Sequence, residues 1–234
     1  MQLIQLIIDG VASGCIYGLV ALGFVLIYKA TETINFAQGD ILMLGAFVAF
    51  SLIGVLGMNY IVGFILTVMI IAVFGFFLDA VVVRQIIGQP AFATVMLTIG
   101  LGFIFRGFAS IYWGTDIFSF STPFSGKITE VGGLIISYVN ISIIVGTTLL
   151  MGILFAFFSF TKIGVAMRAS SENQLAAYYM GIPVKFIFSL IWSISAGVAA
   201  IAGVLLAPIT LVDTSISLIG LKAFAAAVLG GFGS

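Results

Sequence analysis

The sequence predicts an all-α membrane protein, a bundle of transmembrane helices, and three observations lead to this class. Of its 234 residues, 62% are hydrophobic and only 7% are charged, whereas a soluble domain carries roughly 25% charged residues. The mean hydropathy is +1.35. Long apolar runs recur along the whole chain, and about 20 such residues suffice to cross a bilayer as a helix. A helix satisfies its backbone amides within its own segment, so helical spans are the expected structure in lipid.

Six apolar runs are long enough to span a membrane, and a seventh begins near residue 219. The six cover about 3–28, 39–57, 60–81, 91–113, 138–160 and 186–207. The seventh is cut off at Ser234. We therefore expect a single transmembrane domain over 1–234. The first run has no basic residue before Lys29 and exceeds the length of a signal peptide's apolar part, so we expect it to remain as a membrane helix.

The charges and residue counts exclude several functional classes. Eight basic and eight acidic residues leave no net charge, which argues against nucleic acid as a partner. The chain has no histidine, and its single cysteine, Cys15, lies in an apolar run. We therefore expect no catalytic residue, no metal site and no cofactor, and we predict that the chain is not an enzyme.

Lysine and arginine predict the orientation, because cytoplasmic connections carry an excess of these residues. If the N-terminus lies outside and the spans alternate, the external connections hold only Lys127 and Lys222. The cytoplasmic connections then carry Lys29, Arg84, Lys162, Arg168 and Lys185. The segment 161–185 is accordingly expected to face the cytoplasm.

Small and ionisable residues within the spans give further expectations. Gly10, Gly14 and Gly18 recur every four positions and share one face of the first span, which predicts close helix packing there. Arg106 lies deep in the fourth run. It is expected to extend toward the external interface, marked by Tyr112 and Trp113, or else to face the bundle interior, and the first is favoured. Two carboxylates near span ends are expected to be interfacial: Asp9 and Asp79.

The segment 161–185 has the pattern of a short helix outside the bilayer. From about Ser170 to Met180 it lacks glycine and proline, and Ser170 or Ser171 is expected to cap its start. Gly181 and Pro183 are placed to end it. The segment is either an ordinary surface helix or a docking helix for a cytoplasmic partner, with Leu175, Tyr178 and Tyr179 as apolar anchors.

Three stretches resemble the permease subunits of branched-chain amino acid ABC importers. Ala176-Ala177-x-x-x-Gly181 is similar to the cytoplasmic motif of ABC importer permeases, with Glu172 and Asn173 ahead of it. The stretches GCIYGLVALGFVLIYKATETINFAQGDILMLGAF at 14–47 and LKAFAAAVLGGFGS at 221–234 resemble this family in particular. The family continues beyond such a stretch with further spans, so the final helices are expected to be missing here.

The resemblance implies an ATP-driven importer in a bacterial or archaeal inner membrane. Its expected partners are two cytoplasmic ATPases, a second permease subunit (identical or homologous), an external solute-binding protein and the lipid bilayer. The short cytoplasmic helix, at about 170–182, would fit a cleft on the ATPase. The coupling residues are expected to be Arg168, Glu172, Asn173, Ala176, Ala177 and Gly181.

The polar stretch ETINFAQGDI at 32–41 falls between the first two spans. It is either a solvated turn or a part of the transport machinery. In the second interpretation, Asn35 and Gln38 line an inner gate or stabilise re-entrant backbone, because amides both donate and accept hydrogen bonds without the cost of a buried charge. Asp40 is a further candidate for the translocation pathway.

Branched-chain amino acids are the expected substrates. Two alternatives stay open from the sequence: a urea or short-amide importer of the same superfamily and, with less support, an ion-coupled secondary transporter. No span carries the paired carboxylates typical of proton-coupled carriers.

Overall fold

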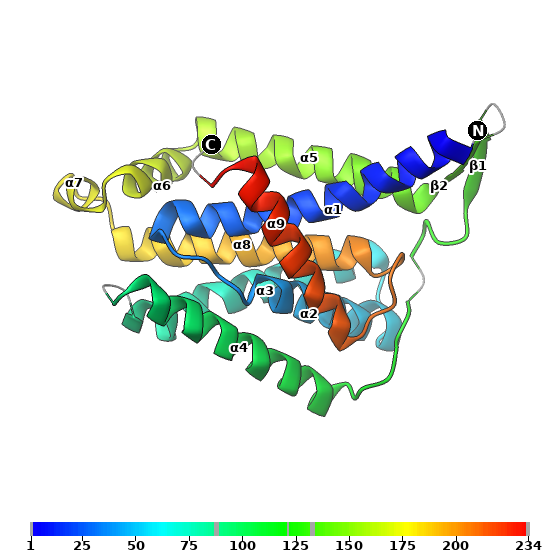
Figure 1. The fold of residues 1–234 in the computed structure, drawn as a ribbon, viewed down its shortest axis with the longest axis horizontal. Coiled ribbons are helices and arrows are strands. Elements are labelled where there is room, and N and C mark those ends of the chain that lie inside the picture. Colours follow the sequence, from blue (N-terminus) through cyan, green and yellow to red (C-terminus); the bar gives the residue numbers. More distant parts are fainter. Residues whose placement is uncertain (1, 87–88, 121, 132–133, 233–234) are drawn as a thin grey trace.

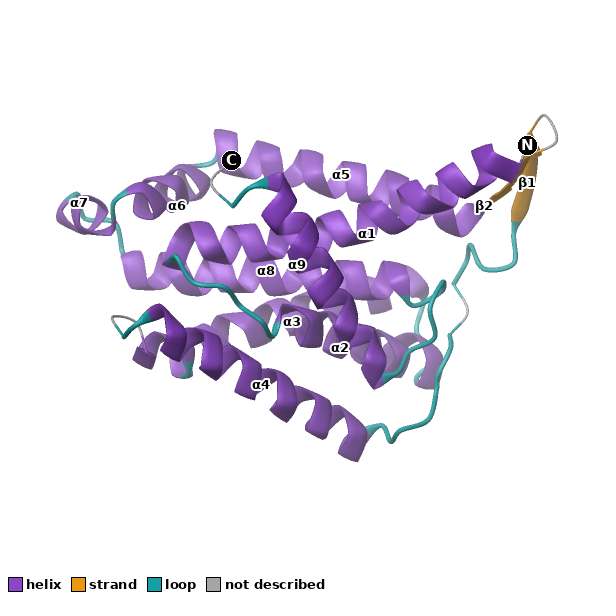
Figure 2. Ribbon diagram, in the orientation of Figure 1, coloured by secondary structure: helices purple, strands orange, loops and turns teal. Residues whose placement is uncertain are grey.

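The computed structural model describes residues 2–86, 89–120, 122–131 and 134–232. Within these residues, six helical segments are long and apolar enough to cross a membrane. They are Leu3–Thr31, Gln38–Val55, Tyr60–Ile86, Phe92–Tyr112, Tyr138–Phe160 and Val184–Leu206. The chain is therefore a multi-pass helical membrane protein (Figures 1 and 2), and the class and the number of complete spans predicted from the sequence are confirmed.

The spans are formed by a small number of long helices. They are α1 (Gln2–Thr31), α2 (Gln38–Ala49) extended by the π-helix η1 (Phe50–Val55), α3 (Tyr60–Val81) followed by the 3₁₀ turn η2 (Val83–Ile86), α4 (Ala91–Tyr112), α5 (Tyr138–Phe160) and α8 (Val184–Leu206). Two short helices, α6 (Lys162–Glu172) and α7 (Gln174–Tyr179), join α5 to α8. A β-hairpin of β1 (Ile128–Val131) and β2 (Leu134–Ser137) precedes α5.

Polar residues in the short connections explain where the helices begin. The side chains of Asn59, Ser137 and Thr161 accept hydrogen bonds from the backbone amides of the first turns of α3, α5 and α6. Such caps satisfy amide groups that the first turn of a helix leaves without partners. Pro90 and Pro183 directly precede α4 and α8, where a missing N–H group costs nothing.

Helices α8 and α2 form the centre of the bundle, and small residues allow their close contact. A Cβ built on Gly45 of α2 would lie 2.7 Å from the Cα atom of Ala200 in α8. One on Gly75 of α3 would lie 2.8 Å from the carbonyl oxygen of Trp192. Close backbone approach of this kind stabilises membrane helices through van der Waals contact.

The glycine face of α1 has no such role within this chain. A Cβ on Gly10, Gly14 or Gly18 would meet no described atom within 4 Å, so no described helix of this chain packs closely on this face, and its packing against another helix stays a prediction. The reason is that the neighbouring helices contact α1 through the side that carries Ala12, Ile16 and other fully buried residues.

The apolar stretch after residue 219 forms a shorter helix than predicted. Helix α9 (Ile219–Gly230) follows the 3₁₀ turn η3 (Thr214–Leu218) and ends before the apolar stretch reaches the length of a span. It crosses the bundle diagonally in front of α1 and α8 (Figure 1). A ring contact attaches it to α1, with the Phe24 and Phe224 centroids 5.7 Å apart. Just after α9, the Phe232 ring lies 4.7 Å from that of Tyr28 in α1.

The two ends of the bundle differ in charge. Helices α6 and α7 project from one end, and the N-terminus and the hairpin lie at the other (Figure 1). The five basic residues expected to be cytoplasmic all lie in elements at the α6–α7 end. These elements are the end of α1, η2, α6 and the start of α8. The predicted alternation of the spans is thus present, and a cytoplasmic location of the α6–α7 end stays a prediction.

Candidate functional site

The connection between α1 and α2 turns back into the bundle. In Figure 1 it runs from the end of α1 along the neighbouring helices before α2 begins. Asn35 and Gln38 are 1% and 0% exposed, so the solvated-turn interpretation is wrong for these residues. Backbone that enters a bundle must find hydrogen-bond partners there, and side-chain amides provide them.

Asn35, Gln38 and Ser195 form a hydrogen-bonded group that we call the amide lock. Asn35 Nδ2 donates to Gln38 Oε1 at 3.2 Å, and Asn35 Oδ1 accepts from the backbone amide of Ala37 at 3.1 Å. Gln38 Nε2 donates to the backbone carbonyl of Ser195 at 3.2 Å, and Ser195 Oγ donates to the carbonyl of Gly23 at 2.9 Å. The lock therefore joins α1, α2 and α8 without burying a charge.

The burial of Asn35 and Gln38 concerns the interpretation in which these two residues line an inner gate. Both amide side chains are shielded from solvent in this conformation, so they do not line an open passage here. Their hydrogen bonds to the Ala37 amide and the Ser195 carbonyl fit the second role that the sequence suggested, support of re-entrant backbone, and that role stays a prediction. Ser195 was missed in the sequence, because a serine inside an apolar run carries no local signal of its partner on another helix.

Asp40 forms an ion pair within the membrane-spanning region. It lies in the first turn of α2 and is 3% exposed. Its Oδ1 atom accepts from Nε of Arg106 in α4 at 2.8 Å. The expected extension of Arg106 toward the external interface is wrong, because a buried carboxylate on the neighbouring helix attracts the guanidinium inward.

Asp79 and Arg84 form a second ion pair, at the α6–α7 end. Asp79 Oδ2 lies 3.3 Å from Arg84 Nη2 and accepts from Ser189 Oγ at 2.6 Å. Arg84 also donates to the carbonyl of Lys185 at 2.9 Å. Asp79 is 0% exposed, so its carboxylate is buried between helices, and its expected position near the membrane interface stays a prediction. The pair links the end of α3 to the start of α8. Asp9, in contrast, is exposed, and its expected interfacial position stays a prediction.

The predicted coupling helix is divided into two helices. Asn173 is extended (φ −153°, ψ 101°) and separates α6 from α7. Its Oδ1 atom accepts from the amide of Ala176 at 2.9 Å and caps α7. The expected cap at Ser170 or Ser171 is wrong, because both serines lie inside α6, which begins two turns earlier at its own cap, Thr161.

The end of α7 lies where the sequence predicted it. Gly181 has φ +83°, a conformation that costs a glycine little and other residues more. The Gly181 amide donates to Tyr178 O and the Ile182 amide donates to Ala177 O, both at 3.0 Å. These two bonds are those of a Schellman motif, so the helix ends sharply at a fixed residue.

Helix α7 presents large apolar side chains to its surroundings. Leu175 and Tyr178 are 70% and 67% exposed, and Tyr179 and Met180 are both 82% exposed. The candidate coupling residues Arg168, Glu172, Asn173, Ala176 and Gly181 are exposed as well. Ala177 differs, since it is 4% exposed and faces the protein. The two alanines of the motif therefore have different surroundings.

A hydrogen bond connects α7 to the end of α1. Gln174 Nε2, in the first turn of α7, donates to the carbonyl of Ala30 at 3.3 Å. Ala30 lies in the last turn of α1, just before the connection that enters the bundle. The bond thus links α7 to the helix end from which the chain continues to the amide lock. Gln174 had no distinguishing signal in the sequence.

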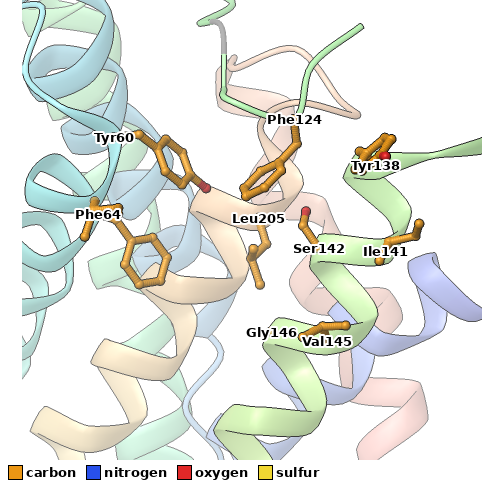
Figure 3. Close-up of a pocket in the computed structure, with 10 residues that line it drawn as sticks. Tyr60, Phe64, Phe124, Tyr138, Ile141, Ser142, Val145, Gly146 and Leu205 are labelled. Atoms are coloured by element: carbon orange, nitrogen blue, oxygen red, sulfur yellow. The ribbon is translucent and has the colours of Figure 1, made fainter. Parts of the chain in front are cut away.

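Cavities occur at both ends of the bundle. One of about 860 Å³ lies between α3, α7 and α8, and one of about 460 Å³ is lined by Arg168 and Glu172 of α6 together with α1, α5 and α8. At the hairpin end, a cavity of about 400 Å³ lies between α3, α5 and α8 (Figure 3). Its rim carries Tyr60, Phe124 and Tyr138, and its lining holds no charged residue.

The fold and these sites define a class of protein, a multi-pass helical membrane protein with buried polar groups between its spans. In the part of the chain that the structure describes, six candidate spans enclose buried polar groups, and a capped, exposed helix projects from one end. The family described as "Branched-chain amino acid transport system / permease component" matches residues 6–234. The chain belongs to this family of ABC transporter permeases, as its sequence resemblance indicated.

Named relatives support the same family. The chain is 30% identical to the high-affinity branched-chain amino acid transport system permease protein BraD of Pseudomonas aeruginosa, over 99% of this chain and 80% of the relative. It is 30% identical to LivH of Salmonella typhimurium, over 100% and 80%. It is 29% identical to a probable LivH of Methanocaldococcus jannaschii, over 91% and 69%. No solved structure matches the chain.

Proposed function

We propose that this chain is a membrane subunit of an ATP-driven importer that carries branched-chain or related neutral amino acids across a bacterial or archaeal inner membrane. In this proposal it works with a second permease subunit, two cytoplasmic ATPases and an external binding protein. The observation that carries the proposal is α7, a short helix with fixed ends that exposes its apolar residues beyond the spans.

The geometry of α7 suits the transmission of force from an ATPase. Large exposed apolar side chains on a surface mark contact sites for other proteins. The helix has an asparagine cap at one end and a Schellman motif at the other, so it can move as one rigid body. ATP binding can shift the transporter only if the contact with α7 differs between conformations.

The path from α7 into the spans runs through described contacts. Gln174 contacts the end of α1, and the connection after α1 reaches the amide lock. We infer that α7 displacement alters the packing of α1, α2 and α8 by this path. Arg168, Glu172, Asn173, Ala176, Ala177 and Gly181 are proposed as coupling residues, and Asn35, Gln38 and Asp40 as residues that control the pathway.

The intramembrane charges support ATP rather than an ion gradient as the energy source. Among the described residues of the spans, the two buried carboxylates, Asp40 and Asp79, are each paired with an arginine. A carboxylate that carries a proton through a transport cycle must lose and regain its charge, and a permanent arginine partner opposes that change.

Transport by the reconstituted complex tests the proposal. The chain would be placed in proteoliposomes with its second permease subunit and ATPases, and labelled leucine or urea would be supplied with the binding protein outside. We expect leucine uptake that requires both ATP and the binding protein. Urea uptake in its place would favour the short-amide alternative. Uptake that continues without ATP under an ion gradient would contradict the proposal and favour a secondary transporter.

A further inference from the structure

Arg106 presents a charged group at the surface of a span. Its side chain is 38% exposed, although the residue lies within the span Phe92–Tyr112. An arginine exposed to hydrocarbon is costly, so intramembrane arginines face protein or water. The exposed part of this side chain is therefore expected to face an aqueous path or another subunit.

The direction of the side chain excludes simple contact with the nearer membrane surface. Trp113 Nε1 donates to Ser51 Oγ at 2.7 Å, so α4 and the α2 span end on the same side. Measured along each helix from this shared end at 1.5 Å per residue, Arg106 lies about 9 Å from the end of its span and Asp40 lies about 22 Å from the end of its own. The guanidinium reaches inward to Asp40, and its central carbon lies 5.0 Å from the centroid of the Phe103 ring.

The ion pair between Asp40 and Arg106 leaves the terminal nitrogens of the guanidinium available for another hydrogen-bond acceptor. Asp40 accepts from Nε, the inner nitrogen, whereas the terminal nitrogens, which carry four further donors, make no hydrogen bond to a described residue. Gly102 leaves the space in which Asp40 sits, because a side chain there would overlap Asp40 Oδ2. Asp40 thus holds the guanidinium through Nε, which leaves its terminal nitrogens for another partner.

We propose that Arg106 receives the α-carboxylate of the transported amino acid as it crosses the membrane, and that Asp40 positions Arg106 for this contact. The inference rests on the proposed transport function. A guanidinium fork matches a carboxylate in geometry and charge. A zwitterion adds no net charge to the neutral pair, so its entry costs less than that of an anion. Urea has no carboxylate and gains nothing from this contact.

Removing both charges distinguishes recognition from support of the fold. In Asp40→Asn/Arg106→Gln, the amides retain hydrogen bonding between α2 and α4, and neither helix buries an unpaired charge. We expect normal membrane insertion and ATPase association, with leucine uptake reduced about tenfold or more. Arg106→Lys, which keeps the charge but not the fork, should give an intermediate uptake. Wild-type uptake by the double variant would overturn the proposal.

Thiol labelling provides a test that leaves the ion pair intact. The background for labelling is Cys15→Ala, which removes the native thiol. Ile99→Cys then places a thiol on the Arg106 face of α4, two turns away. As the control, Ile104→Cys places a thiol on the opposite face, where Ile104 is 64% exposed. We expect a water-soluble methanethiosulfonate reagent to modify residue 99 in the assembled transporter, more slowly during leucine transport, and to leave residue 104 unmodified. No reaction at residue 99, or no effect of leucine, would contradict the proposal.

The experimental outcomes distinguish failure of the proposed transport function from failure of the proposed role of Arg106. If the wild-type complex imports no amino acid under any condition, the proposed function itself fails. If the wild type imports leucine and the double variant imports it equally well, only the role of Arg106 fails, and the ion pair then serves the packing of α2 against α4.

Discussion

Gln38 Nε2 donates to the carbonyl oxygen of Ser195 at 3.2 Å across 157 positions of the sequence. The bond fixes the start of α2 against the middle of α8, the helix against which α1, α2 and α3 pack. Both residues are 0% exposed, so a lost partner would leave a buried polar group unsatisfied, which costs about 1–3 kcal/mol.

Gly23 is predicted to be essential for this contact. No space exists at Gly23 for a Cβ beside Gln38 Nε2, so Gly23→Leu should lower the free energy of unfolding by about 2 kcal/mol through overpacking. The matched control is Gly18→Leu, since Gly18 has no described neighbour within 4 Å of a Cβ. The melting temperatures of the purified subunit measure both changes, and an equal decrease in the two variants would contradict the prediction.

The positive φ of Gly181 predicts a specific loss of coupling. Gly181→Trp should strain the end of α7 and place a bulky group beside its exposed face, while the spans still insert. We expect ATPase subunits to be lost on co-purification. Gly126→Trp serves as the control, because Gly126 also has a positive φ, +75°, but lies just before the hairpin at the opposite end. Normal co-purification with the Gly181 variant would exclude α7 as the docking helix.

The cap of α7 can be tested against an equivalent cap elsewhere. Asn173→Ala removes the acceptor for the Ala176 amide and should destabilise the first turn of α7 by about 1 kcal/mol. We expect reduced stimulation of ATP hydrolysis by the loaded binding protein, with recovery in Asn173→Asp. Asn59→Ala removes a similar cap from α3, at 3.0 Å to the Ile61 amide, and should leave the stimulation unchanged. Equal effects at both sites would indicate a general loss of stability.

The buried Asp79 predicts a non-additive pair of substitutions. Arg84→Gln leaves the Asp79 charge without its partner and should lower the free energy of unfolding by about 3 kcal/mol. Asp79→Asn/Arg84→Gln removes both charges and should recover most of the lost stability. Thermal unfolding of the wild type, the two single variants and the double variant measures the coupling. Additive effects would show that Ser189 and Lys185, rather than the ion pair, hold the two helices together.

Several local features could be predicted from the sequence. Hydropathy located each complete span, and Gly181 marked the end of α7, because apolar length and left-handed backbone are properties of short segments. The polar content of 32–41 indicated a special segment. The cap at Asn173 was missed in favour of Ser170 and Ser171, since a serine can cap a helix or lie within one, and only the position of Thr161 decides between these.

The sequence by itself determined that this chain crosses the membrane repeatedly, that it belongs to a permease family, and where its polar segments lie. Only the tertiary structure decided that Arg106 turns inward to Asp40, that Ser195 completes the amide lock, and that the glycine face of α1 has no close neighbour among the described residues. Span formation depends on backbone hydrogen bonds within each segment. These contacts depend instead on how separate helices rotate and pack, which the pattern of one segment does not specify.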